Sequence, residues 1–250
     1  LSLHGAVFDI KTGTLNVLSK GNITQAANDL KVTGASTLTV TQAASNITLT
    51  GSNNEFSSVV LSKAGSGTMA AVSVNDKDSN PPTTGNGLSI GGAGTTLADT
   101  DLSVTAGGAV TFTGGLLKSL VATSGSHIGQ TGALNVGGAT NLTVHVGTNK
   151  DLLLSGFEND FAGTVTIAAT GAGSFRDIGL RNRNATPSLT GLPSSMRDLT
   201  LIYDQAGIAL PTLSLNGNLR LEAGGPVSQV APTDALNIAG TSSVLLTAFS

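Results

Sequence analysis

Gly21-Asn-Ile-Thr-Gln25 leads into Leu30-Lys-Val-Thr-Gly-Ala-Ser-Thr-Leu-Thr-Val40, and this pair of segments decides the fold because it occurs twice. The second occurrence is Ser126-His-Ile-Gly-Gln130, which leads into Leu134-Asn-Val-Gly-Gly-Ala-Thr-Asn-Leu-Thr-Val144. Ile128 lies 105 residues after Ile23, and Leu142 lies 104 residues after Leu38. A register kept within one residue over such an interval indicates an internal structural repeat.

The repeat extends beyond these segments. Asn54-Glu-Phe56 corresponds to Asn159-Asp-Phe161, again 105 residues later. A third copy begins at Gly225-Pro-Val-Ser-Gln229, whose Gln lies 99 residues after Gln130, and continues into Leu236-Asn-Ile-Ala-Gly-Thr. Each unit of about 100 residues contains several short strands, which predicts about five stacked coils of about 20 residues each.

Short strands account for the pattern within each unit. Apolar and polar residues alternate in segments such as 38–41, 102–105 and 142–146, which is typical of strands with one buried face. No run of ten or more residues combines helical spacing with helix caps. Such strands could also build a sandwich or a barrel. The long-range register favours an all-β, elongated parallel β-helix (a β-solenoid), with coils stacked about 4.8 Å apart.

The chain is predicted to be organised as one unit. Residues 1–250 form a single continuous β-helix in this interpretation, and we expect them to be a fragment of a larger protein because the pattern is cut at both ends. Two segments rich in Pro or Gly interrupt the alternation, at about 75–94 and at 182–193. Both are predicted to be protruding loops.

The composition narrows the classes of function. Only 11% of the residues are charged, and the net charge is −3, with no basic cluster of the kind that nucleic acid binding requires. Cysteine is absent, so thiolate catalysis and Cys-ligated zinc are excluded. No apolar run approaches the roughly 18 residues of a membrane span.

Four residues of the repeated motif are predicted to be structural. Asn54 and Asn159 are expected to satisfy backbone groups at turns, and Phe56 and Phe161 are expected to anchor in the core. These residues are therefore candidates for turn and core anchors rather than for a ligand site.

Acidic and basic residues on the predicted loops are the candidates for a ligand site. Glycoside hydrolysis needs two carboxylates about 5–10 Å apart, and Asp76 with Asp78, or Asp99 with Asp101, could share one face of a strand. Further candidates are Arg181 and Arg183. The alternative is that these four aspartates and two arginines are solvated surface charges without a ligand.

No metal or cofactor site is predicted. The segment that begins at Gly91-Gly-Ala-Gly is similar to a calcium-binding nonapeptide, but Thr96 stands where that motif needs Asp. The three histidines are far apart in the sequence and form no metal-binding pair. The sequence predicts that the protein is not an enzyme.

Residues 175–240 resemble the repeat region of large haemagglutinin-like exoproteins of two-partner secretion systems. The resemblance rests on Leu192-Pro-Ser-Ser-Met-Arg-Asp-Leu-Thr-Leu201, Ala206-Gly-Ile-Ala-Leu-Pro211 and Gly217-Asn-Leu-Arg-Leu-Glu-Ala-Gly-Gly-Pro-Val-Ser-Gln229. Asn-Asp-Phe at 159–161 and Asn-Glu-Phe at 54–56 are similar to turns of the same repeats, so the resemblance covers most of the chain from about residue 15. It implies a right-handed parallel β-helix on a secreted or surface-tethered bacterial protein.

The resemblance also implies a function and partners. We expect a structural shaft or adhesive surface segment that mediates adhesion or displays a distal effector. Its partners would be the family's outer-membrane transporter, through a domain not visible in these residues, and host-cell or matrix glycans and proteins. Two alternatives remain open: a carbohydrate-binding or carbohydrate-active β-helix, and a self-assembling extracellular filament subunit whose open strand edges associate end to end.

Overall fold

A computed structural model describes the chain except for residues 1, 4–7, 11–12, 26–28, 78–86, 93–96, 146, 172–173 and 248–250. The described residues contain strands and turns and no helix. All strand pairs are parallel, and neighbouring strands in a sheet come from successive coils of the chain. The predicted all-β, parallel β-solenoid fold is therefore confirmed.

Two long sheets form the walls of the solenoid. The 9-stranded sheet contains β1 (Ser2–Leu3), β4 (Ile23–Gln25), β6 (Ile47–Leu49), β8 (Ala71–Asp76), β10 (Asp101–Ala106), β13 (Ser119–Ser124), β16 (Thr140–His145), β19 (Thr164–Thr170) and β21 (Ser188–Thr190). The 12-stranded sheet contains β2 (Phe8–Ile10), β3 (Leu15–Ser19), β5 (Leu30–Val40), β7 (Glu55–Lys63), β9 (Leu88–Gly92), β11 (Val110–Phe112), β14 (Ile128–Gln130), β17 (Lys150–Leu154), β20 (Phe175–Asn182), β23 (Asp198–Tyr203), β26 (Leu219–Ala223) and β29 (Ser242–Leu246).

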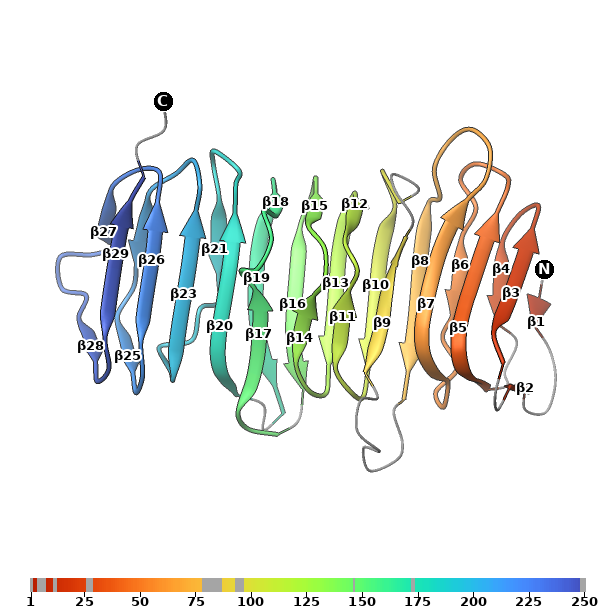
Figure 1. The fold of residues 1–250 in the computed structure, drawn as a ribbon, viewed down its shortest axis with the longest axis horizontal. Helices are drawn as coiled ribbons and strands as arrows, with labels where there is room; N and C mark the ends of the chain where they lie inside the picture. The colour runs from red at the N-terminus through yellow and green to blue at the C-terminus, as the bar shows by residue number, and fades with distance from the viewer. Residues whose placement is uncertain are drawn as a thin grey trace.

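Three small sheets complete the coils at their edges. They contain β12 (Gly115–Leu117), β15 (Leu134–Val136) and β18 (Asp160–Phe161); β22 (Ser195–Met196), β25 (Leu213–Leu215) and β28 (Leu236–Ile238); and β24 (Ile208–Leu210) with β27 (Val227–Gln229). Figure 1 shows the strands side by side in one elongated row, with the two ends of the chain at opposite ends of the row.

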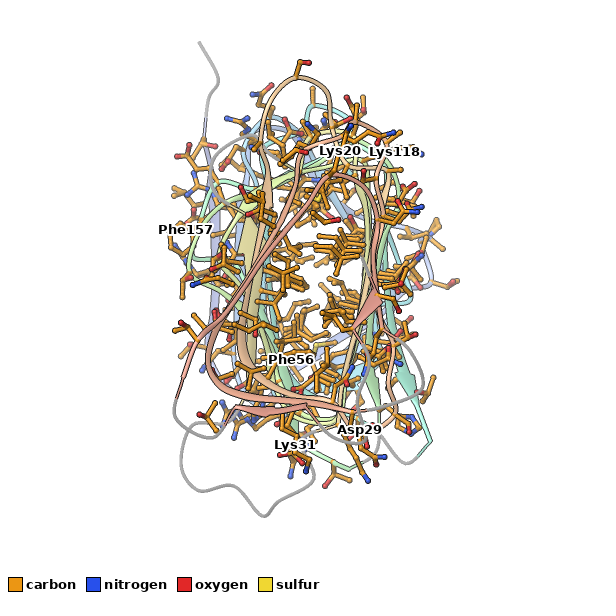
Figure 2. All side chains as sticks on the ribbon, turned by 90° about the vertical axis from the view of Figure 1, so that its right-hand side faces the viewer. Lys20, Asp29, Lys31, Phe56, Lys118 and Phe157 are labelled. Carbon is orange, nitrogen blue, oxygen red and sulfur yellow. The ribbon has the colours of Figure 1, made fainter. Side chains whose placement is uncertain are left out.

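The core is one aliphatic column between the two walls. Inward residues such as Leu102 and Val104 are buried, whereas Ser103 between them faces outward, because successive side chains of a strand alternate. Figure 2 looks along the long axis and shows side chains stacked in the space between the two layers. Each buried aliphatic side chain contributes about 1.5–3 kcal/mol, so the column is the main source of stability.

The repeat spans four and a half coils rather than the five predicted from its length. Ile23 lies in β4, and four steps along the 9-stranded sheet lead through β6, β8 and β10 to β13. Ile128 follows half a coil later, in β14 of the 12-stranded sheet. Corresponding residues of successive repeats therefore lie on opposite walls: Leu38 in β5, Leu142 in β16 and Val244 in β29.

The bounds of the two predicted loops differ from the structure. In the first segment, 75–94, strand β8 continues to Asp76 and β9 begins at Leu88, while 78–86 and 93–94 lie outside the described residues. In the second, 182–193, β21 (Ser188–Thr190) adds a strand next to β19. The proline residues at 187 and 193 flank this edge strand, which fits the exclusion of proline from strand interiors.

Tyr203 is expected to report on the integrity of the fold through its titration. It is the single tyrosine of the chain, and burial raises the pKa of its phenol to about 12. Because the folded pKa exceeds the unfolded value of about 10, the associated stability is present below pH 10 and is lost as the pH rises through about 12. Ultraviolet absorbance should therefore show tyrosinate forming near pH 12 in the folded chain and near pH 10 in denaturant; titration near pH 10 in both would contradict this burial.

Candidate functional site

Asn54 and Asn159 lie in the interior and connect neighbouring coils. The Asn159 side-chain oxygen accepts the Leu134 N–H at 2.9 Å, and its amide nitrogen donates to the Leu154 carbonyl at 2.8 Å. Asn54 makes the same bonds to the Leu30 N–H, at 2.9 Å, and the Leu49 carbonyl, at 3.3 Å. Both side chains are fully buried, so they satisfy backbone groups that water cannot reach.

Each of these asparagines is paired with a glutamine of the preceding coil. Gln130 Nε2 and Oε1 bond the Asn159 carboxamide at 3.1 Å each. Gln25 pairs with Asn54 in the same way, at 2.6 and 2.9 Å. We name each pair a Gln–Asn clamp. Sequence reasoning singled out the two asparagines and missed the glutamines, although both precede their Asn by 29 residues.

The next coil continues the same buried polar column. Phe161 is fully buried, and its N–H donates to the Asn182 side-chain oxygen at 3.0 Å. Phe56 is also buried, and its N–H donates to Asp76 at 2.9 Å. Asp76, a candidate for a ligand loop in the sequence, is therefore a buried residue at the end of β8 that supports the turn at Phe56.

Two of the other loop candidates, Arg181 and Arg183, take part in ion pairs. Asp78 lies outside the described residues. Arg181 bonds Asp204 at 3.0 Å and Glu158 at 3.1 Å, and Arg183 lies 3.6 Å from Asp160. These arginines join neighbouring coils through ion pairs. The structure therefore does not bring Asp76, Arg181 and Arg183 together into one site.

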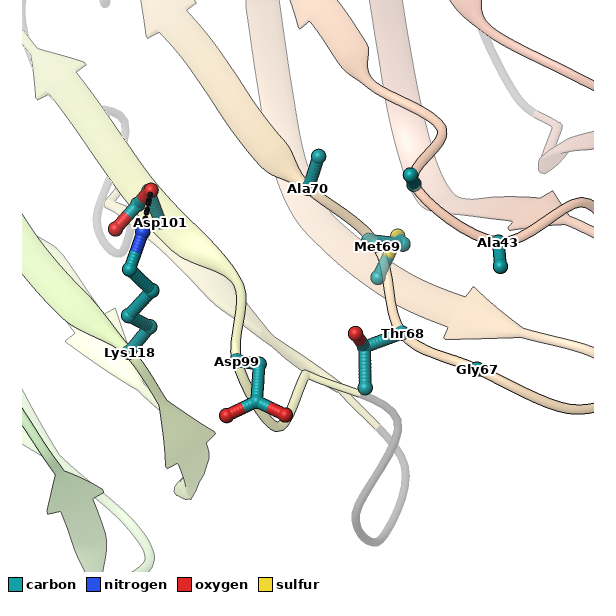
Figure 3. A pocket seen from close by; sticks show the side chains of 9 residues that line it. Ala43, Gly67, Thr68, Met69, Ala70, Asp99, Asp101 and Lys118 are labelled. Atoms are coloured by element: carbon teal, nitrogen blue, oxygen red, sulfur yellow. Dashed lines mark hydrogen bonds and ion pairs between the residues drawn. The ribbon is translucent and has the colours of Figure 1, made fainter.

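Asp99 and Asp101 do lie together, in an open hollow of about 420 Å³ on the lateral surface. Figure 3 shows Asp101 turned toward Lys118, while the Asp99 carboxylate points away from that pair. The opposite rim consists of small residues and one thioether side chain, namely Ala43, Ala44, Gly67, Thr68, Met69 and Ala70.

The two carboxylates of this hollow differ in their surroundings. Asp101 accepts hydrogen bonds from Ser119 Oγ at 2.6 Å and from Lys118 Nζ at 2.9 Å, and these contacts lower its pKa. Asp99 has a left-handed backbone, with φ of 62°, which a short polar residue tolerates. Its carboxylate makes no hydrogen bond or ion pair within the described part of the chain. Asp99 is therefore the exposed carboxylate of the hollow, without a partner among the described residues.

Asp99 also borders a second hollow, of about 330 Å³, and we name the two adjoining hollows together the lateral groove. Its polar lining consists of Asn135, Asp160 and Asn184, which follow one another along the axis. The Asn135 side-chain oxygen has no hydrogen-bond partner within the described residues. A row of carboxylate and amide groups beside small and aliphatic residues can accept hydrogen bonds from, and donate them to, hydroxyl-rich ligands.

A column of alternating charges runs along another edge of the solenoid. Asp151, Asp177 and Asp198 are register partners on three successive coils. Arg176 bonds Asp151 at 2.9 Å and Asp177 at 3.2 Å, and Arg197 bonds Asp177 at 2.8 Å and Asp198 at 2.8 Å. We name these five residues the charge column. The charge column joins neighbouring coils, because each arginine bonds two aspartates of successive coils. No aspartate of the column is therefore without a positive partner.

Because of Asp198, the free energy of unfolding is expected to change with pH in the acid range. The Asn218 N–H donates to its carboxylate at 2.6 Å, and this backbone hydrogen bond is the main reason that its pKa is lowered. The associated stability is present above the unfolded pKa of about 3.9 and is lost as the pH falls through the lower folded pKa. Asp198→Asn should therefore flatten the decline of the urea midpoint below about pH 4; an unchanged decline would contradict this assignment.

The described residues contain no group of three or more His, Asp or Glu side chains placed to hold a metal ion. Within the same residues, no helix is long and apolar enough to cross a membrane.

Comparison with known proteins places the chain in a repeat family. A family model described as repeats of unknown function (DUF5649) matches residues 4–63, 99–168 and 196–248. Each of the three matched segments contains one of the three copies of the repeat, and together they cover more than half of the chain. No curated protein and no solved structure matches the chain. The chain therefore belongs to the DUF5649 family of repeats of unknown function.

Proposed function

We propose that this chain is a structural shaft segment of a secreted or cell-surface bacterial exoprotein of the haemagglutinin-like, two-partner-secretion kind. In this proposal the chain acts as a spacer between the parts of a longer protein on either side of it. Its lateral surface is available for adhesion. The single observation that carries the proposal is the aliphatic column, which continues from Leu15 to Ala223 between the two parallel walls.

Three further features support a shaft. The coils are joined along the axis by backbone hydrogen bonds, by the two Gln–Asn clamps and by the charge column. The ends of the chain lie at opposite ends of the row of strands, so each added repeat increases the reach (Figure 1). Cysteine is absent, which is compatible with export into an oxidising environment. The link to two-partner secretion rests on the sequence resemblance alone.

Surface display tests the proposal. The full chain is placed between an outer-membrane anchor and a terminal epitope on bacteria, and binding of an antibody to the epitope is compared with that of an anchor carrying the epitope directly. A shaft should raise antibody binding, because the epitope stands farther from the lipopolysaccharide layer. Equal or lower binding by cells that display the folded chain would contradict a shaft.

A second candidate function is binding of an extended carbohydrate in the lateral groove. The observation that favours it is the shared position of Asp99 between two hollows, with amide and carboxylate groups following along the axis. Hydrolysis is less well supported than binding. A general acid must be protonated near the working pH, whereas contacts with Ser119 and Lys118 lower the pKa of Asp101.

A glycan and matrix-protein array tests this second candidate. Binding by the purified chain should fall at least tenfold in Asp99→Ala, which loses about 1.4 kcal/mol or more of a charge-assisted hydrogen bond. Asp234→Ala is the matched control, because it removes the same charge from a distant coil. Equal loss in both variants would indicate a nonspecific effect of charge, and no binding by the parent chain would leave the shaft function alone.

A further inference from the structure

Lys63 is a buried lysine that belongs to neither the lateral groove nor the charge column. It is the last residue of β7, and its register partner on the preceding coil is the buried Val40. Only 6% of the surface of Lys63 is exposed. Within the described part of the chain, no carboxylate forms an ion pair with it. A positive charge that is buried in this way must be stabilised by other groups.

Three backbone carbonyl oxygens surround the ammonium group of Lys63. Its Nζ donates to the Ala64 carbonyl at 2.7 Å, to the Ser66 carbonyl at 2.8 Å and to the Thr41 carbonyl at 2.9 Å. An ammonium group has three N–H donors, so each donor has one acceptor. Carbonyl oxygens that converge on one point can replace the hydration shell of a monovalent cation. We name these three oxygens the carbonyl cage.

The segment that supplies two of these oxygens depends on the cation for its order. Residues 64–67 are exposed, so packing in the core does not hold them in place. Gly65 and Gly67 have left-handed backbones, with φ of 79° and 81°, which glycine adopts without a steric penalty. Within the described residues, no backbone–backbone hydrogen bond involves residues 65–67. The bonds from Lys63 are therefore what fixes the course of this turn.

The same segment forms part of the hollow that contains Asp99. Gly67 and Thr68 directly follow the cage and line that hollow, as does Ala44 (Figure 3). The Ala44 N–H donates to the Thr68 carbonyl at 2.9 Å, so the turn is joined to the preceding coil just beyond the cage. A cation in the cage thus holds one rim of the hollow in position.

We propose that the carbonyl cage is a binding site for a primary ammonium group, which Lys63 fills and which accepts a free alkylammonium ion when the Lys63 side chain is shortened. Neutral oxygens 2.7 to 2.9 Å from the nitrogen suit a monovalent cation, because calcium and magnesium take shorter distances and usually carboxylate ligands. The matching ion is n-propylammonium, since Lys63→Ala removes the same carbon and nitrogen atoms that make up this ion.

Thermal unfolding of the full chain tests the site. Lys63→Ala should lower the Tm by about 5 °C or more, because the carbonyl groups of the cage lose their donor. Added n-propylammonium chloride should then raise the Tm of this variant in a saturable way and recover most of the loss, because a ligand that binds only the folded state stabilises it. Sodium chloride at the same concentration controls for ionic strength. If Lys63→Ala does not fold by itself, refolding in n-propylammonium, followed by circular dichroism, gives the same readout.

Two control variants separate the cage from a general effect of the ion. Lys63→Met also removes the ammonium group, but its side chain fills the channel, so its Tm should fall without any response to n-propylammonium. Lys118→Ala removes an exposed lysine and should change the Tm by about 1 °C or less, again without a response. An unchanged Tm in both Lys63 variants, or no response of Lys63→Ala to n-propylammonium, would overturn the proposal. An equal response to sodium chloride or to tetramethylammonium, which has no N–H donor, would overturn it too.

Discussion

Asn159→Leu is expected to lower the free energy of unfolding by about 3–5 kcal/mol, because each buried polar group left without a partner costs about 1–3 kcal/mol. The substitution keeps the approximate size of the side chain but removes both of its hydrogen-bonding groups. The Leu134 N–H and the Leu154 carbonyl lose their partner in the interior, and the half-buried Gln130 carboxamide loses its bonds to Asn159.

Urea denaturation measured by circular dichroism checks this prediction. Asn54→Leu should have a similar cost, because Asn54 makes the corresponding bonds one repeat earlier. Asn141→Leu is the matched control: this residue faces outward on β16, so its replacement should change the free energy of unfolding by about 0.5 kcal/mol or less. Equal effects at positions 141 and 159 would show that the clamp does not hold the coils together.

Phe161→Ala is expected to destabilise the chain by about 3–5 kcal/mol, because it removes a fully buried aromatic ring and leaves a cavity in the column. Phe157 offers a control four residues away, since it is 38% exposed, and Phe157→Ala should cost about 1 kcal/mol or less. Thermal unfolding of both variants gives the comparison. A loss at Phe157 as large as that at Phe161 would contradict the placement of the core.

The core could be predicted from the sequence because it depends on local alternation. Leu102 and Val104, for example, are separated by one outward residue, and the strand geometry alone places both on the same face. The Asn-x-Phe segments were also visible, since they recur at a constant offset. Their glutamine partners were missed because the clamp joins residues 29 positions apart, a distance that exceeds one coil and has no local pattern.

The number of coils per repeat could not be read from the sequence because the coils differ in length. Leu102 follows its register partner Val72 by 30 residues, whereas Leu120 follows Leu102 by only 18. An average of about 20 residues per coil therefore gave five coils where the chain makes four and a half. The half coil matters, because it places corresponding residues of successive repeats on opposite walls.

The lateral groove and the charge column depend on stacking in three dimensions. Asp151, Asp177 and Asp198 are spaced unevenly in the sequence, and the register shifts between Lys150 and Asp151. Asp99 lines the same hollow as Asn135 and Asp160 only because different coils bring the three residues to the same edge. The sequence selected Asp99 and Asp101 as candidates, but the structure supplies the reason to distinguish the open carboxylate from the paired one.

The central claim is that each coil advances the solenoid by one strand spacing, and distances between spin labels test it most directly. Thr111, Leu153, Thr200 and Ser243 lie in one outward row of the 12-stranded sheet, each two coils after the last. Labels on Thr111 and on each later position in turn should give backbone separations of about 10, 19 and 29 Å, a linear increase of about 4.8 Å per coil. Separations that stop growing, or that shorten between Thr200 and Ser243, would show that the chain folds back on itself and would contradict the solenoid.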